Sequence, residues 1–403
     1  MRPIHRSSLT ITAATAALFA LAAPLAAEPV PTGPPNAPDQ EPAFPEQTRA
    51  PELDSGVSLA AEEIAGDLEH PWAVALLPGG DALVTERPGR MRYFSAEDGM
   101  SEPLSGLPEI VAARQGGLLD VTLSPDFDND RMVYFSFSEP RENDNNGTSV
   151  ARGTLSDDNS ALENVEVIFQ AEPGIPNNMH YGSRVVFAPD GNIFVTLGER
   201  SDQEYRVQAQ DPQSHLGKLI RITPEGEVPD DNPYADGEAL PEIYAMGFRN
   251  VQAAAIDADG QLWTIEHGPR GGDELNRPEA GKNYGWPTIT YGVEYAGGEV
   301  GAGLTEKEGM EQPVYYWDPV IAPSGAAFYE GEMFSDWEGS LLIGAMNPPG
   351  LVRLELDGDR VSGEERFDPE IGRIRDVAVS AEDGAIWVVT DEESGGLYRL
   401  SAE

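Results

Sequence analysis

One phrase recurs six times along this 403-residue chain: an apolar strand, a turn built on Pro, Asp or Gly, and a second apolar strand. Turn residues that tolerate positive φ, set between β-branched and aromatic runs, are typical of hairpins rather than helices. Because the phrase runs through the whole chain, it predicts an all-β fold, a six-bladed β-propeller with one blade per copy. A β-sandwich or two stacked β domains are the alternatives, although neither predicts such a recurrence. The six copies are residues 72–85, 121–137, 185–195, 254–263, 326–343 and 377–387.

The spacing between the copies is uneven, so the additional residues must lie in loops. In a propeller, loops from different blades gather on one face around the central channel. We therefore expect any site to lie at that channel mouth, built from residues that are distant in sequence.

Charge and cysteine content exclude several functions. The chain carries 26 Lys and Arg residues against 70 Asp and Glu residues, a formal net charge of −44. This charge repels nucleic acid and anionic lipid, so neither is expected as a partner. The chain has no cysteine, which excludes disulfides, thiolate metal sites and a cysteine nucleophile.

The first residues predict export. Basic residues at Arg2 and Arg6 precede an apolar run that ends in small residues at Ala26 and Ala27. This pattern is typical of a cleaved secretory signal peptide at residues 1–27, and a periplasmic or secreted protein follows from it. A single transmembrane anchor is the alternative. No later segment is long and apolar enough to span a bilayer, so no membrane span is expected after cleavage.

The remaining chain divides into a leader and a domain. Residues 28–56 are rich in Pro and lack hydrophobic periodicity, which predicts an extended, disordered leader. Residues 57–403 contain all six copies of the phrase and are the predicted propeller domain.

Three clusters near strand ends could carry chemistry. His180 stands immediately before a predicted strand, where an imidazole could accept a proton, although His215 and His267 are comparable candidates. The Gly-rich run 268–274 suits either a hard cation or a tight loop closed by its own hydrogen bonds. Arg373 and Arg375 have the same parity on a strand, so they point to one side and suit a polyanionic ligand or a pair of surface ion pairs.

Taken together, these segments resemble the glucose/sorbosone dehydrogenases, the soluble sugar dehydrogenases that use pyrroloquinoline quinone (PQQ). The resemblance extends from Leu68 to Leu400. The segments that carry it are Glu69–Trp72, Gln115–Asp120, His180–Arg184, His215–Lys218, Arg249–Asn250, Glu266–Asn276, Asn283–Pro287, Ala322–Ser324 and Arg373–Asp376.

The resemblance implies a six-bladed propeller with PQQ and Ca²⁺ at the channel mouth. His180 matches the family base, which takes the proton of the anomeric hydroxyl of an aldose while hydride passes to the quinone and a lactone forms. Arg249 matches the arginine that polarises the quinone carbonyl. The carbonyls of Gly268 and Pro269 match calcium ligands. The remaining matches are cofactor contacts, at Gln115, Asn250, His267, Arg373 and Arg375.

The chain departs from the family pattern at a few positions. Asn347 stands where the glucose dehydrogenase branch has a lysine against the cofactor, Met179 replaces an acid before the base, and Val251-Gln-Ala253 replaces Pro-Gln-Gly. The segment around His267 is typical of the aldose sugar dehydrogenase branch. A calcium-dependent lactonase-type hydrolase and a non-catalytic propeller that binds sugar or protein are the alternative functions. The expected partners are an aldose substrate and an electron acceptor of unspecified identity.

Overall fold

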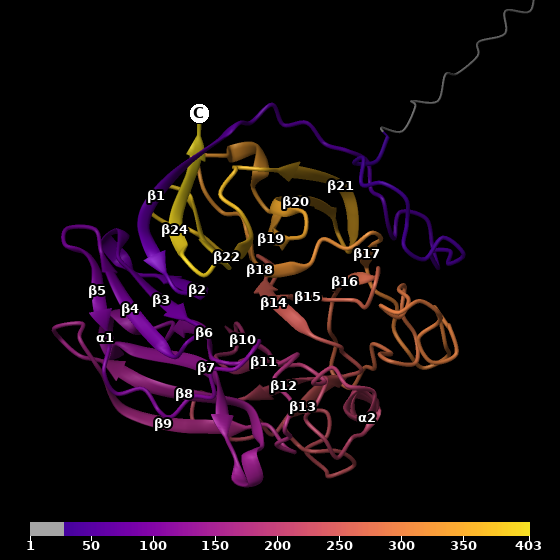
Figure 1. Ribbon diagram of the computed structural model, residues 1–403, viewed down its shortest axis with the longest axis horizontal. Coiled ribbons are helices and arrows are strands. Elements are labelled where there is room, and N and C mark those ends of the chain that lie inside the picture. Colours follow the sequence, from indigo (N-terminus) through magenta and orange to yellow (C-terminus); the bar gives the residue numbers. More distant parts are fainter. Residues whose placement is uncertain (1–27) are drawn as a thin grey trace, which may run out of the picture.

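The structure is a computed structural model that describes residues 28–403. The signal peptide predicted at residues 1–27 lies outside the described residues. Six four-stranded antiparallel sheets surround a central channel, which confirms the predicted six-bladed β-propeller (Figure 1). Among residues 28–403, no helix is long and apolar enough to cross a membrane.

In the first five blades the strands follow the chain from the channel to the rim (Figure 1). Blade 1 contains β2 (Pro71–Leu76), β3 (Ala82–Glu86), β4 (Arg90–Ser95) and β5 (Gly99–Pro103). Blade 2 contains β6 (Leu118–Leu123), β7 (Met132–Pro140), β8 (Asn146–Leu155) and β9 (Leu162–Gln170). Blade 3 contains β10 (Gly182–Phe187), β11 (Ile193–Leu197), β12 (Lys218–Ile222) and β13 (Ile243–Met246).

Blade 4 contains β14 (Val251–Ile256), β15 (Leu262–Glu266), β16 (Asp273–Asn276) and β17 (Tyr315–Trp317). Blade 5 contains β18 (Pro323–Phe328), β19 (Leu341–Met346), β20 (Pro349–Asp357) and β21 (Arg360–Phe367). The connections contain two short helices, α1 (Phe127–Asp130) and α2 (Gln203–Arg206), and 3-10 turns at Pro78–Gly80, Glu142–Asp144, Val207–Gln210 and Ser335–Trp337. Each of the six copies of the sequence phrase forms the two inner strands of one blade.

The sixth, closing blade joins the two ends of the propeller. It contains β22 (Ile374–Val379), β23 (Ile386–Thr390), β24 (Gly395–Ala402) and, as its outermost strand, β1 (Leu59–Leu68). Leu59 pairs with Ala402 and Ala61 with Leu400. Hydrogen bonds between the first and last strands therefore close the ring.

The hydrophobic core lies between neighbouring blades. Inward-facing apolar side chains of each sheet pack against the next sheet, as Val84 of blade 1 and Val389 of the closing blade do in one buried cluster. The alternation of strand residues thus gives each sheet two apolar faces, and each face is covered by a blade.

The inner strand of every blade carries a β-bulge near its first residues. In blade 1, Pro71 pairs with Glu86 and Ala73 with Thr85, so the register skips Trp72. The same shift skips one or two residues in each of the other inner strands: 119–120, 183–184, 252, 324–325 and 375. Bulges turn side chains away from the regular alternation. The bulges therefore re-aim side chains at the end of each inner strand.

The prediction of a disordered leader at residues 28–56 is wrong. Gln47 and Ala50 are fully buried, and this segment donates backbone hydrogen bonds to the outer strands of two blades. The Ala50 amide donates to the Tyr315 hydroxyl at 2.9 Å, and the Leu53 amide donates to the Glu364 carbonyl at 2.9 Å. The segment lacks hydrophobic periodicity because it forms no element of its own. Its backbone pairs with the exposed edges of strands that are already formed.

Candidate active site

Two adjoining cavities open at the channel mouth and share His267 and Ala322. The channel cavity has a volume of about 150 Å³. The loop cavity has a volume of about 510 Å³. The channel cavity is lined by Trp72, Arg87, Gln115, Leu119, Tyr181, Gly182, Asn250, Gln252, His267, Ala322, Met346, Arg373, Arg375 and Asp391. The loop cavity is lined by Asn36, His267, Gly268, Pro269, Arg270, Asp273, Tyr295, Pro319, Val320, Ala322, Asn347 and Pro348.

The β-bulges of different blades supply part of the lining of the channel cavity. Trp72, Leu119, Gln252 and Arg375 are all residues that the strand register skips. Four blades therefore each turn a side chain into the same space. The five residues that the sequence predicted to contact a cofactor, Gln115, Asn250, His267, Arg373 and Arg375, all line this cavity.

His180 lies directly beside the channel cavity. Its backbone amide donates to Gln115 Oε1 at 2.8 Å, and the next two residues line the cavity. Its ring Nδ1 lies 3.1 Å from Glu199 Oε2. The carboxylate of Glu199 makes Nδ1 the protonated nitrogen, because an ionised carboxylate can only accept. The lone pair of Nε2, which has no hydrogen-bond partner among residues 28–403, is then available to accept a proton.

The environment of His180 favours the neutral imidazole. Burial lowers its pKa below the ordinary value, and the charge of Arg249 acts in the same direction, against the opposing charge of Glu199. Burial acts to raise the pKa of Glu199, but its interactions with His180 and Arg249 outweigh burial, so that this pKa is lowered. A neutral imidazole is therefore held next to an ionised carboxylate.

Glu266, at the end of β15, fixes the backbone of Arg249 and Asn250. Its Oε2 accepts hydrogen bonds from both amides, at 2.6 and 3.3 Å. The Arg249 guanidinium donates from Nη1 to the His267 carbonyl at 3.0 Å and lies 5.3 Å from the Trp286 ring centroid. Asn250 Oδ1 accepts from the Gly182 amide at 3.2 Å. Arg249 and Asn250 thus connect the His180 segment to blade 4.

Three arginines and one carboxylate line the other side of the channel cavity. Asp391 lies 3.2 Å from Arg373 Nη2 and 3.7 Å from Arg87 Nη1. The Arg375 guanidinium lies 4.1 Å from the Trp72 ring centroid and donates from Nη2 to Gln252 at 2.8 Å. This side of the cavity therefore carries an excess of positive charge.

Arg375 is a buried cation with an unused donor. Its side chain has no hydrogen-bond partner at Nη1 among the described residues. Burial and the charge of nearby Arg184 lower its pKa to about 9. A buried guanidinium without a full set of partners is costly unless an anion completes it.

The loop 268–272 presents backbone oxygens to the loop cavity. Asp273 shapes this loop: its Oδ1 accepts from the Gly268 amide at 2.8 Å, and its Oδ2 accepts from Ile321 and Ala322. A Cβ on Gly268 would lie 2.1 Å from the Gly272 carbonyl oxygen, so only glycine fits there. The carbonyls of Gly268 and Pro269 accept no hydrogen bond from residues 28–403. They are therefore free to contact a cation.

No cluster of three or more His, Asp or Glu side chains within residues 28–403 is arranged to hold a metal ion. A cation at this loop would therefore depend on backbone carbonyls, water or a bound ligand for most of its coordination. Asn347 also lines the loop cavity and is exposed. The position at which the glucose dehydrogenase branch has a lysine therefore lies at the site, but its side chain carries no positive charge.

His267 separates the two cavities. Its Nε2 lies 2.7 Å from the Pro323 carbonyl, which fixes the proton on this nitrogen. Burial, together with the charge of Arg249, lowers its pKa to about 3. His267 therefore remains neutral at physiological pH and serves as a wall of both cavities.

Sequence reasoning missed several residues of the site. Glu199 lies in a polar segment directly after β11, but nothing in its spacing pairs it with His180. In the sequence, Trp72 looks like a residue of the packed core. Nothing in the sequence around Arg87 or Gln252 indicates that either residue lines a site. Trp72 and Gln252 lie at bulge positions, which only the strand register reveals.

The whole propeller is similar to known sugar dehydrogenases. The sequence profile described as glucose/sorbosone dehydrogenase matches residues 68–399. Aldose sugar dehydrogenase of Escherichia coli (strain K12) is 43% identical over 349 residues, covering 85% of this chain and 93% of that protein. The apo crystal structure of soluble aldose sugar dehydrogenase from Escherichia coli matches with a TM-score of 0.82 at 41% identity, covering 86% of this chain and 100% of that chain. The PQQ-bound aldose sugar dehydrogenase of Streptomyces coelicolor matches with a TM-score of 0.70 at 30% identity, covering 86% and 99%.

Proposed function

The chain belongs to the glucose/sorbosone dehydrogenase family, and we propose that it oxidises aldose sugars with PQQ as its cofactor. The relative from Escherichia coli is an aldose sugar dehydrogenase, and the structure of the relative from Streptomyces coelicolor is of a PQQ-bound form. The observation that carries the proposal is the presence, in one channel mouth, of a buried His–carboxylate pair and a buried guanidinium with an unused donor.

The residues of the channel cavity fit PQQ, which is a planar quinone with three carboxylates. Arg373, Arg375 and Arg87 together exceed the single negative charge of Asp391. The unused Nη1 of Arg375 would donate to a carboxylate, and charge-assisted bonds of this kind are about twice as strong as neutral ones. When bound, PQQ would supply the electrophilic quinone carbon that accepts hydride.

His180 is the proposed base. Oxidation of an aldose to a lactone removes a hydride from the anomeric carbon and a proton from its hydroxyl. The Nε2 lone pair of His180 would take that proton, and Glu199 would stabilise the resulting imidazolium through Nδ1 at 3.1 Å. Because burial lowers the pKa of His180, the base is present in its competent form at neutral pH.

Arg249 is the proposed electrostatic catalyst. Its guanidinium is fixed by the His267 carbonyl and by the Trp286 ring, so it does not need to reorganise during the reaction. A fixed cation beside the reacting centre stabilises negative charge that develops there. Asn250 and Gln115 would hold the His180 segment in register with the cofactor, through Gly182 and the His180 amide.

Calcium is the proposed second cofactor. The free carbonyls of Gly268 and Pro269 line the loop cavity and suit a hard cation that prefers oxygen ligands. Calcium bound there would supply positive charge next to the cofactor site. This charge would partly offset the absence of a cation at Asn347.

The hydrolase alternative requires a different site. A calcium-dependent lactonase would need side-chain carboxylates and amides around a central ion, whereas the channel cavity has three guanidiniums around one carboxylate. A binding-only propeller would not need the buried, neutral His180 with its ordered carboxylate. Both features favour the dehydrogenase.

The deciding experiment is dye-coupled oxidation of glucose and other aldoses by the cofactor-free protein, with PQQ and calcium added separately and together. We expect activity only with both, and the lactone as product. Absence of activity, together with absence of cofactor absorbance in the bound fraction, would transfer support to the hydrolase or the binding-only propeller.

A cofactor titration tests the arginine site directly. Arg375→Met should weaken PQQ binding by about 10- to 100-fold, because a hydrogen bond to a charged group contributes roughly 1.5–3 kcal/mol. Arg399→Met is the matched control, since Arg399 of β24 forms an ion pair with Asp383 and lines neither cavity. Equal affinity in both variants would remove Arg375 from the cofactor site.

Export is also part of the proposal. The basic and apolar segment at residues 1–27 supports cleavage near Ala27 and a periplasmic or secreted location. Mass spectrometry of the mature protein from its native host should give an N-terminus near Glu28. An intact Met1 in a membrane fraction would support the anchor instead.

A further inference from the structure

The N-terminal arm, residues 28–56, reaches the candidate active site from outside the region that the family profile matches. Its two ends meet, because the Glu52 amide donates to the Glu28 carbonyl at 2.9 Å and Pro29 pairs with Pro51. Between these ends the chain extends over the outer strand β17, as the indigo segment at the right of Figure 1 shows, and places Asn36 in the wall of the loop cavity.

Asp318, the residue after β17, receives the tip of the arm. Its Oδ1 accepts from the backbone amide of Asn36 at 2.7 Å and from the Asn36 side chain at 3.1 Å. Its Oδ2 accepts from the Ala37 amide at 2.9 Å. Asp318 is buried, and all three donors come from the arm. The tip is therefore fixed by three hydrogen bonds to one carboxylate.

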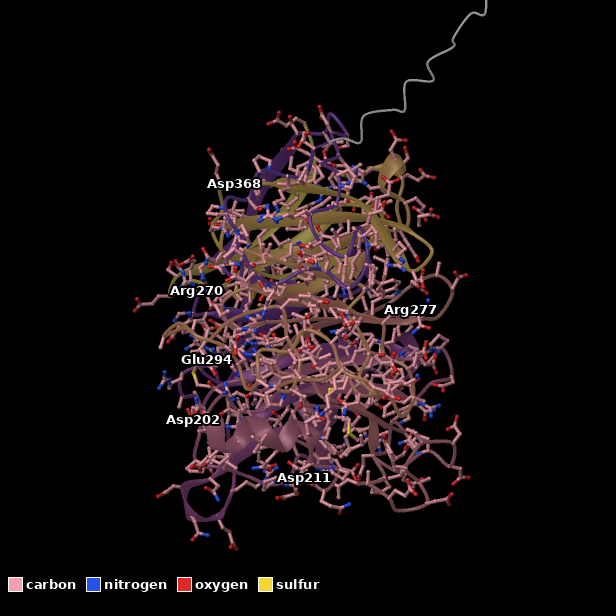
Figure 2. The ribbon with its side chains drawn as sticks, turned by 90° about the vertical axis from the view of Figure 1, so that its right-hand side faces the viewer. Asp202, Asp211, Arg270, Arg277, Glu294 and Asp368 are labelled. Atoms are coloured by element: carbon pink, nitrogen blue, oxygen red, sulfur yellow. The ribbon has the colours of Figure 1, made fainter. Side chains whose placement is uncertain are left out.

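The same aspartate lies against the loop 268–272. A Cβ on Gly271, whose φ is +86°, would lie 2.8 Å from Asp318 Oδ1 and 3.4 Å from the Asn36 Cβ. The Asn36 side chain also accepts a hydrogen bond from Arg270 Nε at 3.2 Å. Arg270 lies on the same face of the propeller as Glu294, opposite Arg277 (Figure 2). The arm thus packs on the outer side of the loop whose inner side presents Gly268 and Pro269.

The arm is anchored well away from its tip. Gln47 is fully buried and donates from Nε2 to the Pro313 carbonyl at 3.0 Å, while its own carbonyl accepts from the Tyr316 amide at 2.8 Å. Arg49 donates to the Asp318 carbonyl at 2.8 Å. These contacts fix the arm to the edge of blade 4. They also cover the outer edge of β17, which would otherwise be an exposed strand edge.

We propose that the N-terminal arm holds the loop 268–272 in its cation-binding conformation, with Asn36 as the positioning residue and a wall of the loop cavity. The loop itself has two glycines in left-handed conformations, Gly271 and Gly272, so its own backbone restrains it little. Contacts from outside supply that restraint. Asp273, Val293 and Trp317 hold the loop by hydrogen bonds. Asn36 adds contacts to Arg270 of the loop and to the adjoining Asp318. The part of this inference that concerns calcium rests on the proposed function.

Hydrogen exchange tests the hold on the loop without any cofactor. The Arg270 and Gly272 amides donate to the carbonyls of Val293 and Trp317, so their protection reports the loop conformation. In Asn36→Ala we expect both amides to exchange about 3- to 10-fold faster, the effect of losing roughly one net hydrogen bond. Deletion of residues 28–52 should give a larger increase. Ser55→Ala is the control, because Ser55 contacts Glu365 at the base of the arm.

Calorimetric titration of calcium chloride into the PQQ-free protein tests the consequence for the cation. Loss of a residue that orients metal ligands typically lowers metal affinity. We expect the calcium affinity of Asn36→Ala to be about tenfold lower than that of the wild type, and the affinity of Ser55→Ala to be unchanged. Unchanged exchange in a folded Asn36→Ala protein would overturn the inference, as would faster exchange with wild-type calcium affinity. If the wild type binds no calcium but Asn36→Ala still exchanges faster, the role of the arm in holding the loop would be supported. The calcium assignment of the proposed function would then be overturned.

Discussion

Two histidine–carboxylate pairs in this molecule have similar nitrogen–oxygen distances and different surroundings. His180 Nδ1 lies 3.1 Å from Glu199, and His215 Nε2 lies 3.4 Å from Glu242. Both imidazoles are buried. The second nitrogen of His215, Nδ1, accepts a hydrogen bond from the Glu172 amide at 3.0 Å. The second nitrogen of His180 has no such partner within the described part of the chain.

This difference separates a structural histidine from a candidate base. His215 uses both ring nitrogens and packs edge-on against Phe169, so it contributes to the fold and has no lone pair to offer. The Glu199 carboxylate is almost fully buried, whereas Glu242 is 26% exposed. A carboxylate partner alone therefore does not identify a catalytic histidine. What distinguishes His180 from His215 is its second ring nitrogen, which has no hydrogen-bond partner among the described residues.

Replacing His180 should have the largest effect. We expect His180→Ala to lower kcat by about 10³–10⁴-fold, in the range of a lost general base, while PQQ affinity changes little. Steady-state kinetics and a cofactor titration on the same preparation measure both quantities. Near-normal turnover in this variant would remove His180 from its proposed role and break the comparison.

Replacing Glu199 should have a smaller effect on rate. In Glu199→Gln the base remains but its tautomer is less firmly fixed, and we expect kcat to fall on the order of 10²-fold. The pH profile gives a second measure. The charge of Glu199 raises the pKa of His180, so its removal should move the acid limb of kcat/KM to lower pH. A limb that stays in place would mean that another group titrates.

Replacing His215 should affect stability rather than rate. In His215→Ala the Glu172 amide loses its acceptor inside the protein, so we expect the free energy of unfolding to fall by about 1–3 kcal/mol. Urea denaturation measures this loss. The folded fraction should keep a kcat close to that of the wild type, and a large loss of kcat would show that the two pairs are not so different.

Replacing Glu242 should have the smallest effect. The hydrogen bond from His215 lowers the pKa of Glu242, so its stabilisation is present above the unfolded-state pKa and is lost as pH falls through the folded-state pKa. Glu242→Gln should therefore cost less than about 1 kcal/mol at neutral pH, and the difference from the wild type should shrink in acid. A difference that grows in acid would contradict this assignment.

The fold was predictable from the sequence because each blade repeats its own signal. Apolar alternation and turn residues in segments such as 185–195 mark the inner strands without reference to any other blade. The N-terminal arm gave no such signal, because Gln47 and Ala50 are ordered only by strands that follow them by hundreds of residues in the chain. Hydrophobic periodicity in a sequence detects helices and strands that bury one of their own faces. The arm instead pairs with the edges of strands that belong to other segments.

The site was predictable only in part, for a related reason. Clusters at strand ends identified His180 and Arg375, since the channel mouth is where propeller loops meet. The pairing of His180 with Glu199 depends on two loops of one blade, and the exposure of Trp72 to the cavity depends on a one-residue shift in strand register. The spacing of residues in the sequence predicts neither feature. From residue chemistry alone, three histidines are comparable candidates, and only their hydrogen-bond partners in the structure distinguish them.

The closing blade has a consequence for how the molecule is made. Strand β1 cannot pair until β24 has been synthesised, because Leu59 meets Ala402 at the far end of the chain. Contacts of such high sequence separation form slowly, and an early strand must wait with an unpaired edge. In β1 the exposed residues include Glu62 and Glu63, whose charges discourage edge-to-edge association in the interval. Closure of the ring thus depends on the last strand of the chain, and the charges on β1 disfavour pairing with another chain before that strand is available.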